Sequence, residues 1–118
     1  MAKINILGQE YDYQEISPKQ DTRLANTDGY MDGYAKLIRI NNDYNENDPS
    51  SIRDFRRYKN KVIRHEIIHA FFQESGLTAY RDDEMFVDWM AIQLPKINKV
   101  LRLFKSLYDE EFKNEKEI

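Results

Sequence analysis

The chain of 118 residues contains no cysteine. Disulfide bonds, thiolate zinc sites and cysteine nucleophiles are therefore excluded, and the composition gives no reason to expect an oxidising compartment. No apolar run approaches the ~20 residues that a membrane-spanning helix needs. The first residues, Met1 to Asn5, lack the basic and then apolar pattern of an export signal. We therefore expect a cytoplasmic protein without a membrane partner.

The chain also lacks an excess of one charge, since 18 lysines and arginines stand against 21 aspartates and glutamates. The net charge of −3 gives no general reason to expect nucleic-acid binding. One local exception is a run of six cations that contains a single acid, Asp54. We interpret this run as a solvated helix face, with contact to an acidic protein or a phosphate backbone as the alternative. The cations are Arg53, Arg56, Arg57, Lys59, Lys61 and Arg64.

Histidine is scarce, and the only two histidines are His65 and His69, in the sequence His-Glu-Ile-Ile-His. Residues four apart lie on the same face of a helix, one turn from each other. Two imidazoles so placed can bind one divalent metal, and Glu66 between them lies close enough to act as a catalytic base. Coincidence would produce this pattern on the order of a few times in a thousand. The motif therefore predicts a metal site, with two packed histidines as the alternative.

The first 48 residues are expected to form mostly strands and loops. Apolar residues alternate with polar ones over residues 4–6, and Gly8-Gln9 separates them from a second segment over residues 11–16, which predicts a β-hairpin. Asp32-Gly33 is typical of a two-residue type I′ turn. It precedes residues 34–40, the segment with the strongest strand character in the chain.

A long helix is expected over residues 49–75, with Asp48 or Ser50 as its cap. Gly76 should end it, because glycine readily takes the left-handed conformation that follows many helices. Residues 65–72 are apolar on nearly every side, so this part of the helix should be buried. Buried histidine and glutamate side chains need a polar partner, and a metal ion would supply one.

Two further helices are expected after this one. The first should span residues 82–94 and open at Asp82 or Asp83, since acids suit the positive end of a helix dipole. Pro95 should then break or kink the chain, because proline lacks the N–H that a helix interior needs. A last helix should follow over residues 95–112. Strands first and helices afterwards predict an α+β fold in a single domain, residues 1–118.

The third metal ligand must be an aspartate or a glutamate, because the chain has no further histidine and no cysteine. Glu84 is the strongest candidate, since it lies at the start of the helix that follows His69. Asp88, one turn further on, either orients a ligand histidine through its other ring nitrogen or is itself the ligand. Asp82 and Asp83 are weaker candidates, because a capping role explains them. The alternative for Glu84 and Asp88 is that both are surface acids on an amphipathic helix.

The motif and its surroundings resemble the ImmA/IrrE-type metallopeptidases of bacteria, mobile elements and phages. In that family a strand precedes the His-Glu-x-x-His helix, a glutamate on the next helix completes the site, and a proline follows eleven residues later. Glu84 and Pro95 reproduce this spacing, and the resemblance covers roughly residues 34 to 95.

The sequence departs from that family at three places. Ile68 stands where the family usually has glycine, and Phe86 and Asp88 stand where asparagine and phenylalanine often occur. The resemblance therefore implies a divergent or minimal member. It implies a zincin-like fold, in which a small antiparallel or mixed sheet packs on the active-site helix and two further helices follow.

The function implied is zinc-dependent hydrolysis of a peptide bond, with one Zn²⁺ per chain and a protein or peptide substrate, such as a regulator from a phage or mobile element. Glu66 would be the catalytic base, and the strand over residues 34–40 an edge on which a peptide could pair. An oxyanion donor would have to be a tyrosine or an arginine, with Tyr80 and Tyr34 as candidates. The alternative is a metal-binding regulatory or interaction protein with little or no peptidase activity.

Overall fold

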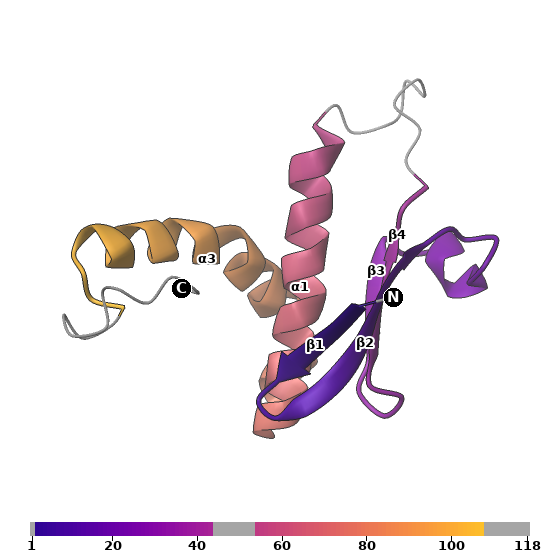
Figure 1. Ribbon diagram of the computed structural model, residues 1–118, viewed down its shortest axis with the longest axis horizontal. Helices are drawn as coiled ribbons and strands as arrows, with labels where there is room; N and C mark the ends of the chain where they lie inside the picture. The colour runs from indigo at the N-terminus through magenta and orange to yellow at the C-terminus, as the bar shows by residue number, and fades with distance from the viewer. Residues whose placement is uncertain (1, 44–53, 108–118) are drawn as a thin grey trace.

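The computed structural model describes residues 2–43 and 54–107, and it shows an α+β fold (Figure 1). The predicted α+β class is confirmed, and a four-stranded mixed sheet is followed by two main helices that pack together. Within the described ranges, no helix is long and apolar enough to cross a membrane. The elements are β1 (Ala2–Ile6), β2 (Gln9–Ile16), the 3₁₀ turn η1 (Thr22–Ala25), β3 (Gly29–Asp32), β4 (Leu37–Asn41), α1 (Phe55–Ser75), α2 (Thr78–Arg81) and α3 (Glu84–Leu103).

The strands lie in the order β1-β2-β4-β3. β1 and β2 form the expected antiparallel hairpin, and its two turn residues, Leu7 and Gly8, both have positive φ. β4 pairs in parallel with β2 and antiparallel with β3. Because β4 uses both of its sides for pairing, the expectation that residues 34–40 provide a free edge is wrong. The edge strand at that side of the sheet is β3.

The connection between β3 and β4 also differs from the prediction. Asp32 pairs with Leu37, so the loop holds four residues rather than a two-residue type I′ turn. The Asp32 carboxylate accepts hydrogen bonds from the backbone N–H groups of Tyr34 and Ala35, at 3.0 and 2.9 Å. This side-chain cap stabilises the wider loop, and Lys36 rather than Gly33 takes the left-handed conformation (φ 58°).

Helix α1 begins at Phe55, later than residue 49, because Asp54 is its N-cap and accepts a hydrogen bond from the N–H of Arg57. The caps proposed from the sequence, Asp48 and Ser50, lie outside the described residues. The predicted end is confirmed. Gly76 has φ 82°, and the N–H groups of Gly76 and the following residue bond to carbonyl groups of the last helical turn.

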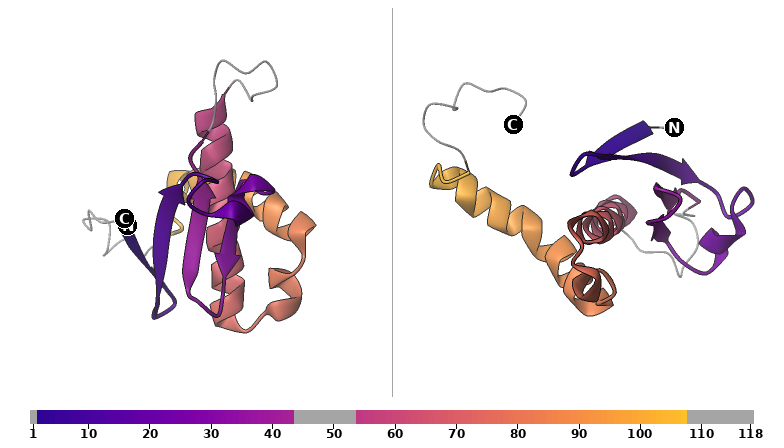
Figure 2. Two further views of the ribbon diagram at one scale, coloured as in Figure 1. Left: turned by 90° about the vertical axis from the view of Figure 1, so that its right-hand side faces the viewer. Right: turned by 90° about the horizontal axis from the view of Figure 1, so that it is seen from below.

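Helix α1 lies between the sheet and α3 (Figure 2). Its side that faces the sheet closes one apolar core, and its side that faces α3 closes a second, smaller one. The buried residues of the first core are Ile6, Tyr11, Ile38, Ile40, Val62 and Ala70. Those of the second are Ile68, Val87 and Ala91. The histidine-bearing helix is therefore fixed from both sides.

Helix α3 continues through Pro95, so the predicted division into helices over 82–94 and 95–112 is wrong. Proline cannot donate the backbone hydrogen bond that the carbonyl of Ala91 would receive in a regular helix. The Nε–H of Arg64 on α1 donates to that carbonyl instead, at 2.6 Å. A side chain from the neighbouring helix thus replaces the missing donor. Helix α3 ends at Leu103, and residues 108–112 lie outside the described ranges.

The basic run on α1 is only partly a solvated face. Lys59 forms an ion pair with Glu15 on β2, and Lys61 pairs with Asp88 on α3 at 3.1 Å. Together with Arg64, these cations tie α1 to the two layers that flank it. Arg53 lies outside the described residues.

Candidate metal site

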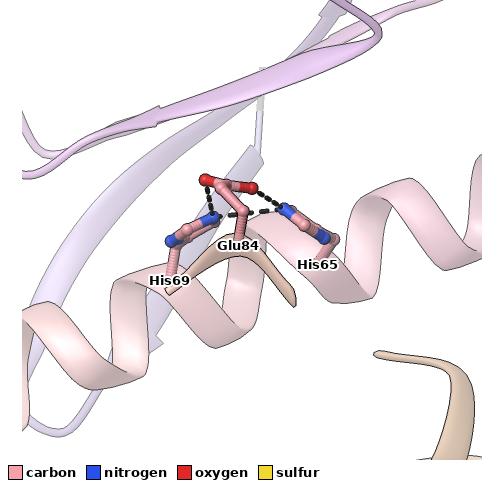
Figure 3. Close-up of side chains that lie close together, drawn as sticks. All are labelled: His65, His69 and Glu84. Atoms are coloured by element: carbon pink, nitrogen blue, oxygen red, sulfur yellow. Dashed lines mark hydrogen bonds and ion pairs between the residues drawn. The ribbon is translucent and has the colours of Figure 1, made fainter. Parts of the chain in front are cut away.

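Three side chains from two helices converge at one point (Figure 3). His65 and His69 lie one turn apart on α1, and their Nε2 atoms are 3.1 Å from each other. The two carboxylate oxygens of Glu84, in the first turn of α3, lie 2.9 Å from the Nε2 atoms of His65 and His69 respectively. All three donor groups lie within 4.8 Å of one another, so the group could hold a metal ion.

The spacing of these atoms fits a single tetrahedral ion. Two nitrogen ligands bound at about 2.1 Å from zinc at the tetrahedral angle would lie about 3.4 Å apart. The observed 3.1 Å between the Nε2 atoms of His65 and His69 is close to this value. Two imidazole nitrogens and a carboxylate at these distances cannot all present lone pairs to one another, so a hydrogen on a ring nitrogen or a bound cation must lie between them.

Local structure brings Glu84 to the histidines. Asp83 is the N-cap of α3 and accepts a hydrogen bond from the N–H of Phe86 at 3.0 Å, so Glu84 is the first helical residue. The apolar contact of Ile68 with Val87 and Ala91 then holds this end of α3 against α1. The predicted ligand candidate Asp83 is thereby used as a cap, which its sequence position had suggested.

His69 is buried and hydrogen-bonded to the backbone of Arg81. Burial lowers its pKa below the usual value for histidine, and this effect outweighs the neighbouring carboxylate of Glu84. A lowered pKa favours the neutral imidazole, which is the form that binds metals. The backbone contact fixes the orientation of the ring, as hydrogen bonds to the second nitrogen of ligand histidines usually do.

Asp88 lies on the far side of His65 from the point of convergence. Its carboxylate oxygen is 3.2 Å from the Nδ1 atom of His65, whereas the Nε2 atom faces Glu84. The same oxygen pairs with Lys61, at 3.1 Å. Of the two roles considered for Asp88, this position fits the residue that orients a ligand and not the ligand itself.

Glu66 is buried, with 7% of its surface exposed, and faces the same cleft as the two histidines. Its carboxyl group makes no hydrogen bond or ion pair with any residue in the described part of the chain. Desolvation is the largest cause that raises its pKa, to about 7, and the nearby charge of Glu84 acts in the same direction. A carboxyl group with this pKa can accept and release a proton near neutral pH.

The cleft next to these residues has a volume of about 750 Å³ and lies between α1, β3 and the end of α2. Tyr34 borders it from the tip of the β3–β4 loop, where its side chain is 94% exposed. Tyr80 lies elsewhere: its ring packs against Phe72 and Phe86, and it is not among the described residues that line the cleft. Asp82 lines the cleft and pairs with Arg81.

Sequence reasoning missed several residues of the cleft wall. Arg81 lines it, with one guanidinium nitrogen 2.7 Å from the Oε1 atom of Gln73. Tyr30 and Asp32 contribute from β3, and Arg23 from η1. Their spacing in the sequence carries no common period, because they come from four separate elements that only the tertiary fold brings together.

Comparison of the chain with protein-family models, with curated proteins and with solved structures finds no match in any of the three.

Proposed function

We propose that this protein is a zinc-dependent peptidase that hydrolyses a peptide bond in a protein substrate. The observation that carries the proposal is the convergence of His65, His69 and Glu84 beside a buried glutamate, Glu66, on the wall of an open cleft. The resemblance of these residues to the ImmA/IrrE-type pattern supports the same function. A regulator encoded by a phage or mobile element is the kind of substrate which that resemblance suggests.

One zinc ion per chain would be held by the Nε2 atoms of His65 and His69 and the carboxylate of Glu84. Zinc favours such nitrogen and oxygen donors, and a site with three protein ligands leaves a position open for chemistry. When bound, zinc supplies Lewis-acid chemistry, which activates water and polarises a carbonyl group. Asp88 and the backbone of Arg81 would hold the two imidazole rings in place.

Glu66 would accept the proton of the attacking water and later donate it to the nitrogen of the leaving amine. Its position suits both steps, because the carboxyl group lies next to the two histidines on the wall of the same cleft. Arg81 and Tyr34 border the cleft and are the candidates to donate a hydrogen bond to the developing oxyanion.

The substrate backbone would pair with β3. This strand forms the edge of the sheet next to the cleft, and all four of its residues line the cavity. An extended peptide can add to such an edge through main-chain hydrogen bonds, without a requirement for one particular sequence. Residues 29–32 are thus proposed to pair with the substrate backbone, in place of residues 34–40.

The first experiment is elemental mass spectrometry of purified, untagged protein. We expect close to one zinc per chain in the wild type and in Asp82→Asn, which alters a cleft acid outside the metal group. His69→Ala and Glu84→Gln should each lose most of the metal, and only the wild type and Asp82→Asn should melt at a higher temperature when zinc is added. Equal zinc content in all four proteins would contradict the assigned ligands.

The second experiment tests the reaction. Wild type and Glu66→Gln are each loaded with zinc and incubated with a proteome-derived peptide library, and new termini are identified by mass spectrometry. We expect cleavage by the wild type only, at equal metal content. Metal binding without any cleavage that depends on Glu66 would refute the peptidase and favour a metal-binding regulatory protein.

A further inference from the structure

The second half of α3 extends away from the rest of the fold (Figures 1 and 2). We call residues 96–104 the α3 arm. Apolar side chains of the arm are exposed rather than buried: the exposed fraction is 42% for Ile97, 54% for Val100, 69% for Leu103 and 78% for Phe104. Four large apolar residues on so short a segment form the kind of surface that proteins use to contact partners.

Charge on the arm has a single sign. The sequence contains no acid between Asp88 and Asp109, whereas Lys96, Lys99 and Arg102 all lie on the arm. These three cations are exposed and form no ion pair with any residue of the described ranges. In a chain with a net charge of −3, such a segment is a local reversal of sign, so its electrostatic complement is an acidic surface.

The two residue types are arranged in parallel rows with a period of three. The cations occupy positions 96, 99 and 102, and Ile97, Val100 and Leu103 occupy the next positions along. On an α-helix, residues three apart are displaced by about 60° around the axis, and such rows form ridges inclined by roughly 45° to it. The arm therefore presents one basic ridge beside one apolar ridge, and both run obliquely.

We propose that the α3 arm is a docking surface for an acidic amphipathic segment of another protein. A partner helix that crosses α3 at an angle can lie along the oblique ridges, with apolar side chains against Val100 and Leu103 and carboxylates against the cations. A flat anionic membrane would contact a straight strip parallel to the helix axis, which includes only part of each ridge. A second copy of this chain would bring like charges together. The proposal does not depend on the metal site.

The test uses the full chain and a fluorescent synthetic helical peptide of glutamate, leucine and alanine, with leucine and glutamate in adjacent rows. A matched peptide carries lysine in place of every glutamate. Binding is followed by fluorescence anisotropy, and amide chemical shifts locate the contact. We expect micromolar binding of the acidic peptide, at least tenfold weaker binding of the lysine peptide, and shifts centred on residues 96–104.

Two double variants should each bind the acidic peptide at least tenfold more weakly than the wild type. They are Val100→Ser with Leu103→Ser, and Lys99→Glu with Arg102→Glu. The matched controls are Leu7→Ser and Lys19→Glu, which alter an exposed apolar residue and an exposed cation on the sheet side of the molecule. Circular dichroism establishes that each variant is folded. Equal affinity in the arm variants and the controls would overturn the proposal.

Three other results would also overturn the proposal, because each would identify a different binding partner of the α3 arm. Tighter binding to vesicles of mixed phosphatidylcholine and phosphatidylglycerol than to the acidic peptide would assign the arm to a lipid surface. A dimer in sedimentation that the arm variants abolish would assign it to a second copy. A tenfold gain in peptide affinity after Asp109, Glu110 and Glu111 are changed to their amides would assign it to the chain's own acidic segment.

Discussion

The hydrogen bond from Arg64 to the carbonyl of Ala91 predicts an energetic coupling between Arg64 and Pro95. Ala91 is completely buried, and Pro95 leaves its carbonyl without a helical donor. The Nε–H of Arg64 donates a hydrogen bond to this carbonyl at 2.6 Å. Replacement by methionine keeps the apolar stem but removes the donor. Leaving a buried acceptor unpaired costs about 1–3 kcal/mol.

The change Pro95→Ala restores an N–H at residue 95, which can donate to Ala91 within the helix. In that background Arg64→Met should therefore cost less than about 0.5 kcal/mol, since the carbonyl keeps a partner. The coupling energy from the four proteins should be at least about 0.5 kcal/mol. For a domain of this size, the melting temperature of Arg64→Met should fall by roughly 4 °C for each kcal/mol lost.

Urea unfolding followed by circular dichroism measures the four free energies of unfolding. Zinc affinity provides a second measurement, because a looser α3 would move Glu84 away from the two histidines. We expect Arg64→Met to bind zinc more weakly and Arg64→Met with Pro95→Ala to recover most of the loss. If Arg64→Met destabilises both backgrounds by the same amount, the donor explanation is refuted and the arginine acts through packing alone.

Three further predictions concern the site and its support. Asp88→Asn should weaken zinc binding about tenfold or more at unchanged stoichiometry, because His65 loses its orienting carboxylate, whereas Lys61→Met should weaken it much less; calorimetric titration measures both. In the metal-free protein the pKa of Glu66 is raised from 4.5 to about 7, so stability should fall as pH rises through this window. Between pH 4.5 and 8 the wild type should lose up to about 3 kcal/mol of its free energy of unfolding, and Glu66→Gln should not show this loss. The same pH dependence of unfolding in both proteins would contradict the burial effect. Gly29→Ala should destabilise by about 1–3 kcal/mol, since a Cβ there would lie 2.9 Å from Ile40 and 3.1 Å from Val62. Gly33→Ala meets only the flexible Gln73 side chain and should cost less in the same unfolding assay.

Local signals in the sequence were sufficient for those features that depend on neighbouring residues. The spacing of His65 and His69 places both on one helix face, whatever surrounds the helix. Gly76 ends α1 because a left-handed residue is needed there, and Asp83 caps α3 through a bond within one turn. The hairpin of β1 and β2 likewise follows from alternation and a short turn.

Two features that depend on contacts distant in the chain were predicted wrongly. Pro95 reads as a helix breaker, yet α3 continues because Arg64, 27 residues before Ala91, supplies the donor that the Ala91 carbonyl lacks. The strand over residues 37–41 reads as an edge, yet it is enclosed by β2 and β3. Local propensity carries no information on either partner.

The sequence by itself determined the donor set of this protein: with two histidines and no cysteine, any site with three protein ligands had to include a carboxylate. The tertiary structure alone decided which carboxylate lies beside the two histidines. Helix α3 packs across α1 so that Glu84 faces the Nε2 atoms and Asp88 faces the other nitrogen of His65. The physical reason is that a side chain's distance to a ligand on another helix depends on how the two helices cross, and this crossing is set by the apolar contacts of Ile68, Val87 and Ala91.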